Sequence, residues 1–572
     1  MVKKVGIGLG LLLPIASFYY TSMSYGLDVP WFDDIENIPF FLSQWLDAPT
    51  WQARFTALLR PNNEHRVLTA RLLVYFNYLL TGQVSFYWLL QIGNLTVLGI
   101  FCLLARVYLK QGGQWLMLIA ASFFIFNLQF YSMTFMTIMA LQYQLIICEV
   151  FLVLYLLTKA RATAYFIAAI GVAVLGTFSM GNGMMVWPTG ALVLVLLAHW
   201  QRLRVWLLVG VLAVWAYFSG YNIAQNNEAA FGYFSQNAFK VIVGFFVFVG
   251  GILDWFPTIT FGRRMLIPGL GGGFILAFFL FYVVGTLTVL PQWKNQLPRP
   301  VIQFYQRFGY FKSIAPEYAT FWVGCFVFLL INSALVVFFR TRFDYKLILW
   351  ATYKIYPGTL MAMSVLLCAQ IVPARWKAVV STVFIVMAGV SWASSYWYFV
   401  PEVQYQQKQR MAFGLNQQRN GLGLGAYKHS AFADFAVKTM QSARDKGFYQ
   451  LPSPLIDTQE IQLERTLRDT AQVYQITDLA LKYTADVLEL VNERLTYTDG
   501  KNVGAFVVIY SPQYFYVFAG RPQSYKNGST TSFKAFCPLG SICEGQYQVA
   551  VWLVQKEGNQ LFRNRQTVLI NP

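Results

Sequence analysis

The chain has 572 residues, of which 57% are hydrophobic, 18% aromatic and only 12% charged, and its mean hydropathy is +0.47. Soluble domains carry about a quarter charged residues, so the composition excludes an ordinary soluble protein and predicts a polytopic α-helical membrane protein. The net charge of +18 does not indicate a nucleic-acid partner. Many of the Lys and Arg residues lie in short loops, where the cytoplasmic side of membrane proteins collects them.

Long apolar runs predict the membrane-spanning helices, because roughly 20 apolar residues cross the hydrocarbon layer as a helix. Residues 5–20 follow two lysines and are predicted as an uncleaved first helix rather than a signal peptide, which places the N-terminus in the cytoplasm. A long polar loop, 21–81, is then expected outside the membrane. Further helices are expected at residues 84–108, 114–130, 137–158, 163–179, 185–199 and 203–221.

The apolar stretch 238–256 is interpreted as a re-entrant segment or as a segment lying in the outer interface. The most basic loop, 293–312, is expected in the cytoplasm, and only an odd number of crossings reaches it from the outer side. Crossing helices are therefore expected at residues 265–291, 317–339, 347–370 and 376–398. The total is about eleven crossings by the length criterion, which places everything after Tyr398 outside.

Residues 400–572 change character and predict an extracytoplasmic α+β domain. Residues 425–498 are expected to be helical, and the short β-rich runs of 502–572 are typical of a small antiparallel β-sandwich. Four aromatic residues of the second part fit either a sugar-stacking platform or, as is more usual for alternating aromatics, the core of the sheet. They are Tyr510, Tyr514, Phe515 and Tyr516. Cys537 and Cys543 are spaced for a local disulfide if the domain lies in an oxidising compartment.

Adjacent acids follow the first helix directly. Asp33 and Asp34 cannot share one face of a helix, so one is expected to point into a cavity while the other caps a helix or is solvated. The alternative is that Asp34 simply caps a helix over 35–46.

The same loop contains Asn63, Glu64, His65 and Arg66 in "NNEHR". A helix is expected to begin near Pro61, and an acid in its first turn would also be favoured by the helix dipole alone. A helix dipole does not account for the neighbouring His and Arg at a membrane surface.

Several cations are expected on the outer side, against the positive-inside trend. They are Arg263, Arg264, Arg340 and Arg342. Lys354 is expected about two turns into the next helix, where a charge is costly and indicates function, unless the side chain snorkels to the interface. Acids and cations on one face predict a site for a lipid-linked phosphate or pyrophosphate. Arg and Lys would bind the anion, apolar helices would hold the polyprenyl chain, and a carboxylate would act as general base or metal ligand.

Four segments, in this order, resemble the GT-C superfamily of membrane glycosyltransferases, in particular the bacterial enzymes that use polyprenyl-phosphate sugars. They are "DDIEN" (33–37), "NNEHRVLTARL" (62–72), "GNGMMVWP" (181–188) and "RTRF" (340–343). The resemblance covers about residues 1–400 and implies a catalytic transmembrane domain, 1–399, in the bacterial plasma membrane, followed by a periplasmic domain, 400–572. The chain has Phe343 where the family leads us to expect Tyr.

The resemblance also implies roles for the charged residues. Asp33 or Asp34 would be the catalytic base, and the reaction would invert the anomeric carbon. Donor-phosphate binding would fall to Arg340, Arg342 and Lys354. From their charge and their expected place on the same face, Arg66, Arg263 and Arg264 are further candidates for donor-phosphate binding. The acceptor site would be formed by Asn63, Glu64 and His65. A divalent cation, Mg²⁺ or Mn²⁺, is left open as a cofactor, with Asp34, Glu64 and His65 as its ligands if it is present.

Other classes of protein share some of these features. A polysaccharide polymerase or ligase would use the same cations on a polyprenyl-pyrophosphate donor. A transporter or lipid flippase would be expected to show duplicated halves, and no such repeat is visible in the sequence. The acceptor can be a glycan, a lipid or a protein, and the sequence does not name it.

Overall fold

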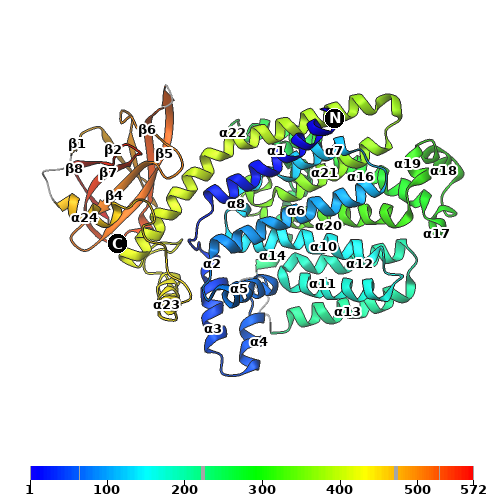
Figure 1. Ribbon diagram of the computed structural model, residues 1–572, viewed down its shortest axis with the longest axis horizontal. Coiled ribbons are helices and arrows are strands. Elements are labelled where there is room, and N and C mark those ends of the chain that lie inside the picture. The colour runs from blue at the N-terminus through cyan, green and yellow to red at the C-terminus, as the bar shows by residue number, and fades with distance from the viewer. Residues whose placement is uncertain (1, 63–64, 221–225, 469–473, 527–528, 571–572) are drawn as a thin grey trace. The chain divides into compact units, whose positions relative to one another are not determined.

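The computed structural model describes residues 2–62, 65–220, 226–468, 474–526 and 529–570. The chain divides into two compact units (Figure 1). The first comprises Met1–Ser24, Leu58–Leu72 and Leu90–Val400, and is helical. The second comprises Tyr25–Ala57, Leu73–Leu89 and Pro401–Pro572, and combines short helices with a β-sheet.

Long apolar helices build the first unit. They are α1 (Val2–Tyr25), α6 (Phe86–Lys110), α7 (Trp115–Ile125), α10 (Leu145–Leu157), α11 (Thr163–Ser179), α12 (Val186–Leu196), α13 (Trp200–Phe218), α14 (Asn226–Val249), α16 (Leu266–Val289), α20 (Pro316–Arg340), α21 (Ile355–Ile371) and α22 (Ala374–Asn420). The residues of α22 from Pro401 onward belong to the second unit. Within the described ranges, nine helical segments are long and apolar enough to cross a membrane, and three more are shorter. These helices indicate a membrane protein, and they coincide with the predicted spans to within a few residues over most of the chain.

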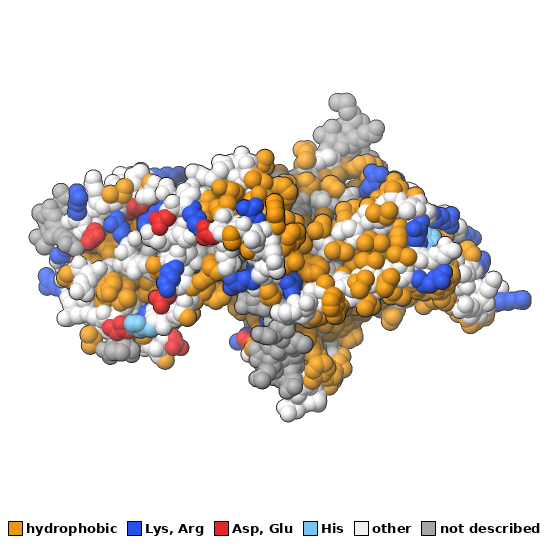
Figure 2. Space-filling model, turned by 90° about the horizontal axis from the view of Figure 1, so that it is seen from below, with side chains coloured by type: hydrophobic (Ala, Val, Ile, Leu, Met, Phe, Trp, Pro, Cys, Tyr) orange, Lys and Arg blue, Asp and Glu red, His pale blue; other side chains and the backbone are white. Residues whose placement is uncertain are grey.

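Large apolar side chains cover the outside of this unit. On α13, Leu208 is 62% exposed, Val211 67% and Trp215 71%. Figure 2 shows the same feature as a broad hydrophobic surface over the helices, with Lys and Arg side chains mainly toward one end. Exposed apolar area on this scale is unfavourable in water and suits a hydrocarbon environment.

One end of the unit, which we call the basic end, gathers the loops around Lys110, Lys159 and Arg202 with residues 293–312. Gln111 Oε1 accepts hydrogen bonds from Tyr310 OH at 3.2 Å and from Trp322 Nε1 at 3.3 Å. The Lys159 ammonium lies 5.3 Å from the centre of the Tyr318 ring, and Arg202 Nη2 donates to Thr163 Oγ1 at 2.8 Å. These loops therefore share one end, as their charge pattern predicts. Their side of the membrane stays a prediction.

Helix α14 crosses the opposite end of the bundle. Helices α16 and α20 run antiparallel, with Phe279 and Phe326 in ring contact near their middles. The first half of α14 touches the last turn of α20, where the Phe231 and Phe338 rings lie 5.0 Å apart. Its last turns meet the first turns of α16, since Gly250 lies directly against Pro268. Both halves of α14 thus contact the same end of the bundle. This arrangement fits the interfacial interpretation of 238–256, although α14 also has the length and composition of a span.

The second unit contains α2 (Asp33–Ile35), a π-helical turn over Glu36–Phe40, α3 (Phe41–Asp47), α23 (Ala431–Asp445) and α24 (Glu460–Arg468). The prediction that helix extends to residue 498 is wrong, because strands begin at Tyr474. The segment 487–492 alternates between buried and half-buried side chains, which is the period of a strand.

The strands form one eight-stranded sheet rather than the two sheets of a sandwich. They are β1 (Tyr474–Ile476), β2 (Leu479–Tyr483), β3 (Val487–Asn492), β4 (Gly504–Tyr510), β5 (Phe515–Lys526), β6 (Ser529–Pro538), β7 (Gly545–Val554) and β8 (Gln560–Ile570). Their order is β1-β8-β7-β4-β5-β6-β3-β2, and only the β1–β8 pair is parallel. One face encloses a core to which strands from both edges contribute, so the sheet is strongly curled. The other face packs on Met411 and Leu415 of α22 and on α24.

Both faces of β4 are buried, which favours the sheet core over a sugar-stacking platform for the aromatic residues of this region. Tyr510, Phe515 and Tyr516 are 8%, 5% and 0% exposed and belong to the core of this unit. Cys537 and Cys543 are free thiols, so the expected disulfide is absent from this structure. The unit also holds a buried ion pair between Lys408 and Asp499.

Candidate functional site at one end of the helical unit

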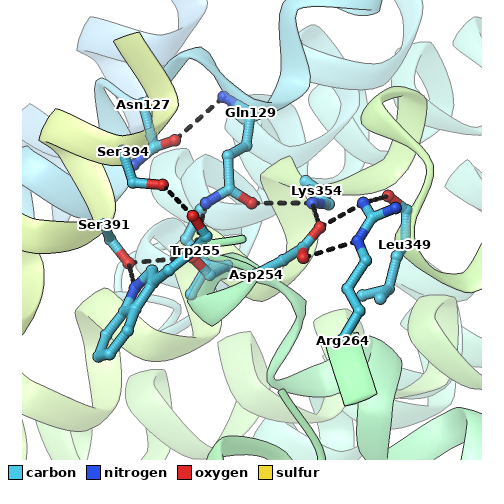
Figure 3. A network of polar contacts seen from close by, with 10 residues as sticks. Asn127, Gln129, Asp254, Trp255, Arg264, Leu349, Lys354, Ser391 and Ser394 are labelled. Atoms are coloured by element: carbon cyan, nitrogen blue, oxygen red, sulfur yellow. Dashed lines mark hydrogen bonds and ion pairs between the residues drawn. The ribbon is translucent and has the colours of Figure 1, made fainter. Parts of the chain in front are cut away.

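Asp254 is the centre of a buried polar network at the end of the bundle opposite the basic end (Figure 3). Its Oδ1 accepts a hydrogen bond from Arg264 Nε at 2.7 Å, and its Oδ2 accepts from Arg264 Nη2 at 2.5 Å. Lys354 Nζ donates to the same Oδ2 at 2.5 Å and to Gln129 Oε1 at 2.9 Å. The forked Arg–carboxylate pair and the lysine bring together residues that are distant in the sequence. We call these four residues the Asp254 network.

The charges of the network explain how a buried acid is tolerated. Asp254 is 2% exposed, and burial alone raises the pKa of a carboxyl group. The charges and hydrogen bonds of Lys354 and Arg264 outweigh this effect and hold the pKa of Asp254 below its ordinary value. With one carboxylate and two cations, the network has an excess of one positive charge. Such an excess favours a nearby anion.

Lys354 differs from the sequence expectation. It precedes the first residue of α21 instead of lying two turns inside the helix. Its side chain does not snorkel, because Lys354 is only 2% exposed and its ammonium is bound to Asp254. Short 3₁₀ turns at Tyr345–Leu349 and Ala351–Tyr353 replace the predicted first turns of the helix.

Three further predicted cations lie at the same end. Arg263 is exposed, and Arg340 and Arg342 are half-buried. In the part of the chain that the structure describes, neither Arg263 nor Arg340 forms an ion pair with an acid. Arg342 lies over the ring of Phe343, 4.6 Å from its centre, so the aromatic character of position 343 supports the arginine. Together with the Asp254 network, these residues make this end of the unit strongly cationic.

Arg66 and Arg71 bind backbone carbonyl groups. Arg66 Nε donates to the carbonyl of Tyr217 at 2.8 Å and Nη2 to that of Ser219 at 2.7 Å, while Nη1 donates to the carbonyl of Leu59. Arg71 Nη1 donates to the carbonyl of Leu58 at 3.1 Å. Carbonyl groups at the end of α13 have no hydrogen-bond donors within the helix, and the Arg66 guanidinium supplies these donors. Its predicted role in phosphate binding stays a prediction.

His65 lies beside the "GNG" turn. The described residues 60–62 and 65–67 are not helical, in contrast to the predicted helix at Pro61. Asn62 and His65 form an isolated β-bridge, and α5 (Leu68–Thr81) begins at Leu68. A Cβ atom added to Gly181 would lie 2.7 Å from His65 Nδ1, so glycine allows this close approach. Asn63 and Glu64 lie outside the described residues.

A second buried carboxylate lies close to this turn. Glu149 Oε1 accepts hydrogen bonds from Thr69 Oγ1 at 3.2 Å and from Ser179 Oγ at 3.4 Å. Asn182 Nδ2 donates to Tyr356 OH at 2.8 Å, and Tyr356 is two residues from Lys354. His65, Arg66, the "GNG" turn and the Asp254 network therefore share one end of the helical unit.

Asp33 and Asp34 belong to the second unit. Asp34 is 1% exposed, and its Oδ2 accepts a hydrogen bond from the Trp31 backbone N–H at 3.0 Å. It therefore faces backward along the chain and does not act as the N-cap of a following helix. Asp33 is half-buried, and burial together with the charge of Glu36 raises the pKa of its carboxyl group. Of the two acids, Asp33 has the properties expected of a base.

Among the described residues, no group of three His, Cys, Asp or Glu side chains is placed to hold a metal ion. Of the predicted ligands, Glu64 lies outside the described residues, so the metal site formed by Asp34, Glu64 and His65 stays a prediction.

Sequence reasoning missed Asp254, Gln129 and Glu149. The available signal for Asp254 was an acid at the end of an apolar run, nine residues before a pair of arginines. Gln129 and Glu149 lie inside apolar runs, where a single polar residue is easily taken as part of a span.

Comparison of this chain with protein-family models, with curated proteins and with solved structures found no match.

Proposed function

We propose that this protein is an integral-membrane glycosyltransferase that moves a sugar from a polyprenyl-phosphate donor to an acceptor hydroxyl. One observation carries the proposal: cations from three separate segments, 263–264, 340–342 and 354, gather at one end of a bundle of apolar helices. Arg264 and Lys354 bind the same carboxylate (Figure 3), and Tyr345, shortly after 340–342, contacts the Phe261 ring. A lipid-linked phosphate needs both features, since guanidinium groups bind its oxygens and apolar helices hold its chain.

In this proposal the exposed and half-buried arginines bind the donor phosphate. Arg263, Arg340 and Arg342 have side chains that a ligand can reach. Lys354 contributes its charge from a buried position and holds Asp254 rather than the ligand. As the bond between the anomeric carbon and the phosphate oxygen breaks, negative charge accumulates on the phosphate. Fixed cations stabilise that charge at the moment of transfer.

Asp33 is the proposed general base. Its carboxylate accepts the proton of the acceptor hydroxyl while the acceptor oxygen attacks the anomeric carbon. The electron pair of the broken bond leaves with the polyprenyl phosphate, and the anomeric carbon is inverted. The raised pKa of Asp33 favours this role, because a base works best when its pKa approaches the working pH.

An apolar groove on the helical unit is the proposed site of the polyprenyl chain. It has a volume of about 920 Å³. Its lining comes from α12, α13 and the turn before α12: Met184, Met185, Trp187, Pro188, Leu207, Gly210, Val211, Val214, Trp215, Phe218 and Ser219. The groove reaches Ser219, whose carbonyl accepts the Arg66 hydrogen bond at 2.7 Å, so it extends to the same end of the unit as the cations.

A donor-consumption assay tests the proposal. The purified full-length protein is incubated with a polyprenyl-monophosphate sugar and a glycan or lipid acceptor, and release of polyprenyl phosphate is measured. The proposal expects release that depends on both protein and acceptor. Turnover of a polyprenyl-pyrophosphate donor alone would identify a polymerase or ligase instead. Movement of the lipid across a vesicle membrane without transfer would identify a transporter.

A further inference from the structure

The turn that carries Asp254 is anchored from several directions. Trp255 Nε1 donates to Ser391 Oγ at 2.6 Å, and Ser394 Oγ donates to the Trp255 carbonyl at 2.6 Å. Gln129 Nε2 donates to the carbonyl of Ile252 at 2.8 Å. Helix α22 and the turn that follows α7 therefore both hold this segment (Figure 3). The Asp254 carboxylate has a fixed position relative to the cations that it contacts.

Asp254 occupies only one edge of the Arg264 guanidinium. Nε and Nη2 are bonded to the carboxylate, and Nη2 also lies 3.4 Å from the Leu349 carbonyl. Nη1 forms no hydrogen bond within the described ranges. The Arg264 side chain keeps 19% of its surface exposed, and Arg263 beside it is exposed. The remaining edge of Arg264 is thus held ready for an anion.

The same carboxylate limits the charge of the site. Lys354 and Arg264 together carry two positive charges, and Asp254 cancels one of them. A phosphodiester, the linkage in a polyprenyl-phosphate sugar, carries a single negative charge, and a pyrophosphate linkage carries at least one more. Arg263, Arg340 and Arg342 add their charges at the same end. The negative charge of Asp254 therefore does not balance the whole site, but it weakens the attraction for a pyrophosphate more than for a phosphodiester.

We propose that Asp254 is a positioning and specificity residue, which orients Arg264 and selects a singly charged phosphodiester donor over a pyrophosphate donor. This inference rests on the proposed function, since it takes the cationic end as the phosphate site. The effect acts through charge. At a separation of roughly 8 Å and an effective dielectric constant near 20, one unit of charge changes relative binding by roughly tenfold or more.

Two substitutions at contacting positions test the inference because they predict opposite changes. The wild-type protein and both variants are titrated in detergent with a short-chain polyprenyl-phosphate sugar and with the matching polyprenyl-pyrophosphate sugar. The readout is the ratio of the two dissociation constants, which does not depend on the fraction of folded protein. Asp254→Asn adds positive charge and should lower the preference for the monophosphate donor by roughly tenfold. Lys354→Met removes positive charge and should raise the preference for the monophosphate donor.

Asp499→Asn is the matched control. It breaks a buried Lys–Asp ion pair of the same kind, formed with Lys408 in the other unit, and should leave the ratio unchanged. If one of the two network variants fails to fold, the other still decides the question. Each has its own predicted direction.

The outcomes separate the two proposals. Absence of binding to either donor by the wild-type protein contradicts the proposed function and this inference together. A monophosphate preference that Asp254→Asn and Lys354→Met leave unchanged, or shift in the same direction, contradicts only the role of Asp254. Opposite shifts with an unchanged Asp499→Asn ratio support it.

Discussion

The two ends of the helical unit hold the same types of basic residue in different environments. At the basic end, Lys and Arg contact aromatic rings and hydroxyl groups: Arg106 Nε donates to Tyr155 OH at 3.2 Å, and Arg202 lies 4.9 Å from the centre of the Phe166 ring. At the other end, Lys354 and Arg66 are almost fully buried and bind a carboxylate or backbone carbonyls.

The difference separates two reasons for a membrane protein to carry cations. Exposed cations beside aromatic rings satisfy the charge bias that orients helices, and the individual residue matters little. Buried cations must be compensated by specific partners, so each residue matters. The predictions below run from the largest expected effect to the smallest, and each compares one end with the other or separates chemistry from binding.

The largest effect is expected for Asp33→Asn, which removes the proposed base. Turnover should fall by about 10²–10⁴-fold, while donor affinity should change little, because the cations that bind the phosphate are intact. Steady-state kinetics and donor titration on the same preparation measure both quantities. Asp47→Asn is the control: this acid of the same loop forms only a surface ion pair with Lys446. Full turnover by the Asp33→Asn variant would show that Asp33 is not the general base.

Arg66→Ala should reduce the free energy of unfolding by about 2–3 kcal/mol, because it leaves buried carbonyl groups without their charged donor. Chemical unfolding in detergent measures the loss. Arg202→Ala at the basic end should cost less than about 1 kcal/mol, as exposed contacts usually do. Equal losses of unfolding free energy for the two variants would contradict the proposed difference between buried and exposed cations.

Arg340→Ala and Arg263→Ala should each weaken donor binding by roughly tenfold through loss of a charge-assisted contact, with little change in stability. Affinity should also fall with increasing salt. Arg202→Ala serves again as the control and should bind donor normally. If it weakened binding as much as Arg340→Ala, the phosphate site would have to be sought at the basic end.

The stabilising effect of Asp254 should depend on pH in a defined direction. The pKa of its carboxyl group lies below the ordinary value of 3.8 in the folded protein, so the unfolded chain binds the proton first as pH falls. Its contribution is present above about pH 4 and is lost on further acidification. The melting temperature of the wild type should therefore exceed that of Asp254→Asn near pH 6, and the gap should narrow near pH 3. A difference in melting temperature that does not change with pH would contradict the ion pairs of Asp254 with Arg264 and Lys354.

Filling the apolar groove should have the smallest effect, a few-fold increase in KM for a long-chain donor. Val211→Trp places a ring into the groove, whereas Leu208→Trp, on the same helix and also exposed, does not line it. The two variants should differ with a long-chain donor and agree with a short-chain one. Identical behaviour with both donors would exclude the groove as the lipid site.

The helical part of the fold was largely predictable from sequence. Apolar periodicity placed 163–179 on the residues of α11, and charge bias grouped the basic loops correctly. The predicted and observed bounds differ where polar tertiary contacts occur, as at Lys354, which lies just before α21 and whose ammonium binds Asp254. A hydropathy pattern detects the apolar run, but it carries no information about Asp254, which lies 100 residues away in the sequence.

The second unit shows the limits of local pattern more clearly. Its strands were expected, but their order was not, because pairing such as β1 with β8 depends on contacts across the whole domain. The aromatic residues of "YFYVF" were ambiguous between a binding surface and a core. In the structure Phe515 packs on the face that α22 and α24 cover, and Tyr516 lies in the core on the opposite face of the sheet. The candidate cations were found because they depart from the positive-inside bias. Asp254, the acid that binds two of them, was missed.

The central claim is that the lipid-linked phosphate binds at the Asp254 end of the helical unit. A structure of the full-length protein with a non-hydrolysable polyprenyl-phosphate sugar analogue tests it most directly. The account predicts phosphate density within hydrogen-bonding distance of Arg263, Arg264 or Arg340. Density among Lys110, Lys159 and Arg202 at the basic end would contradict it.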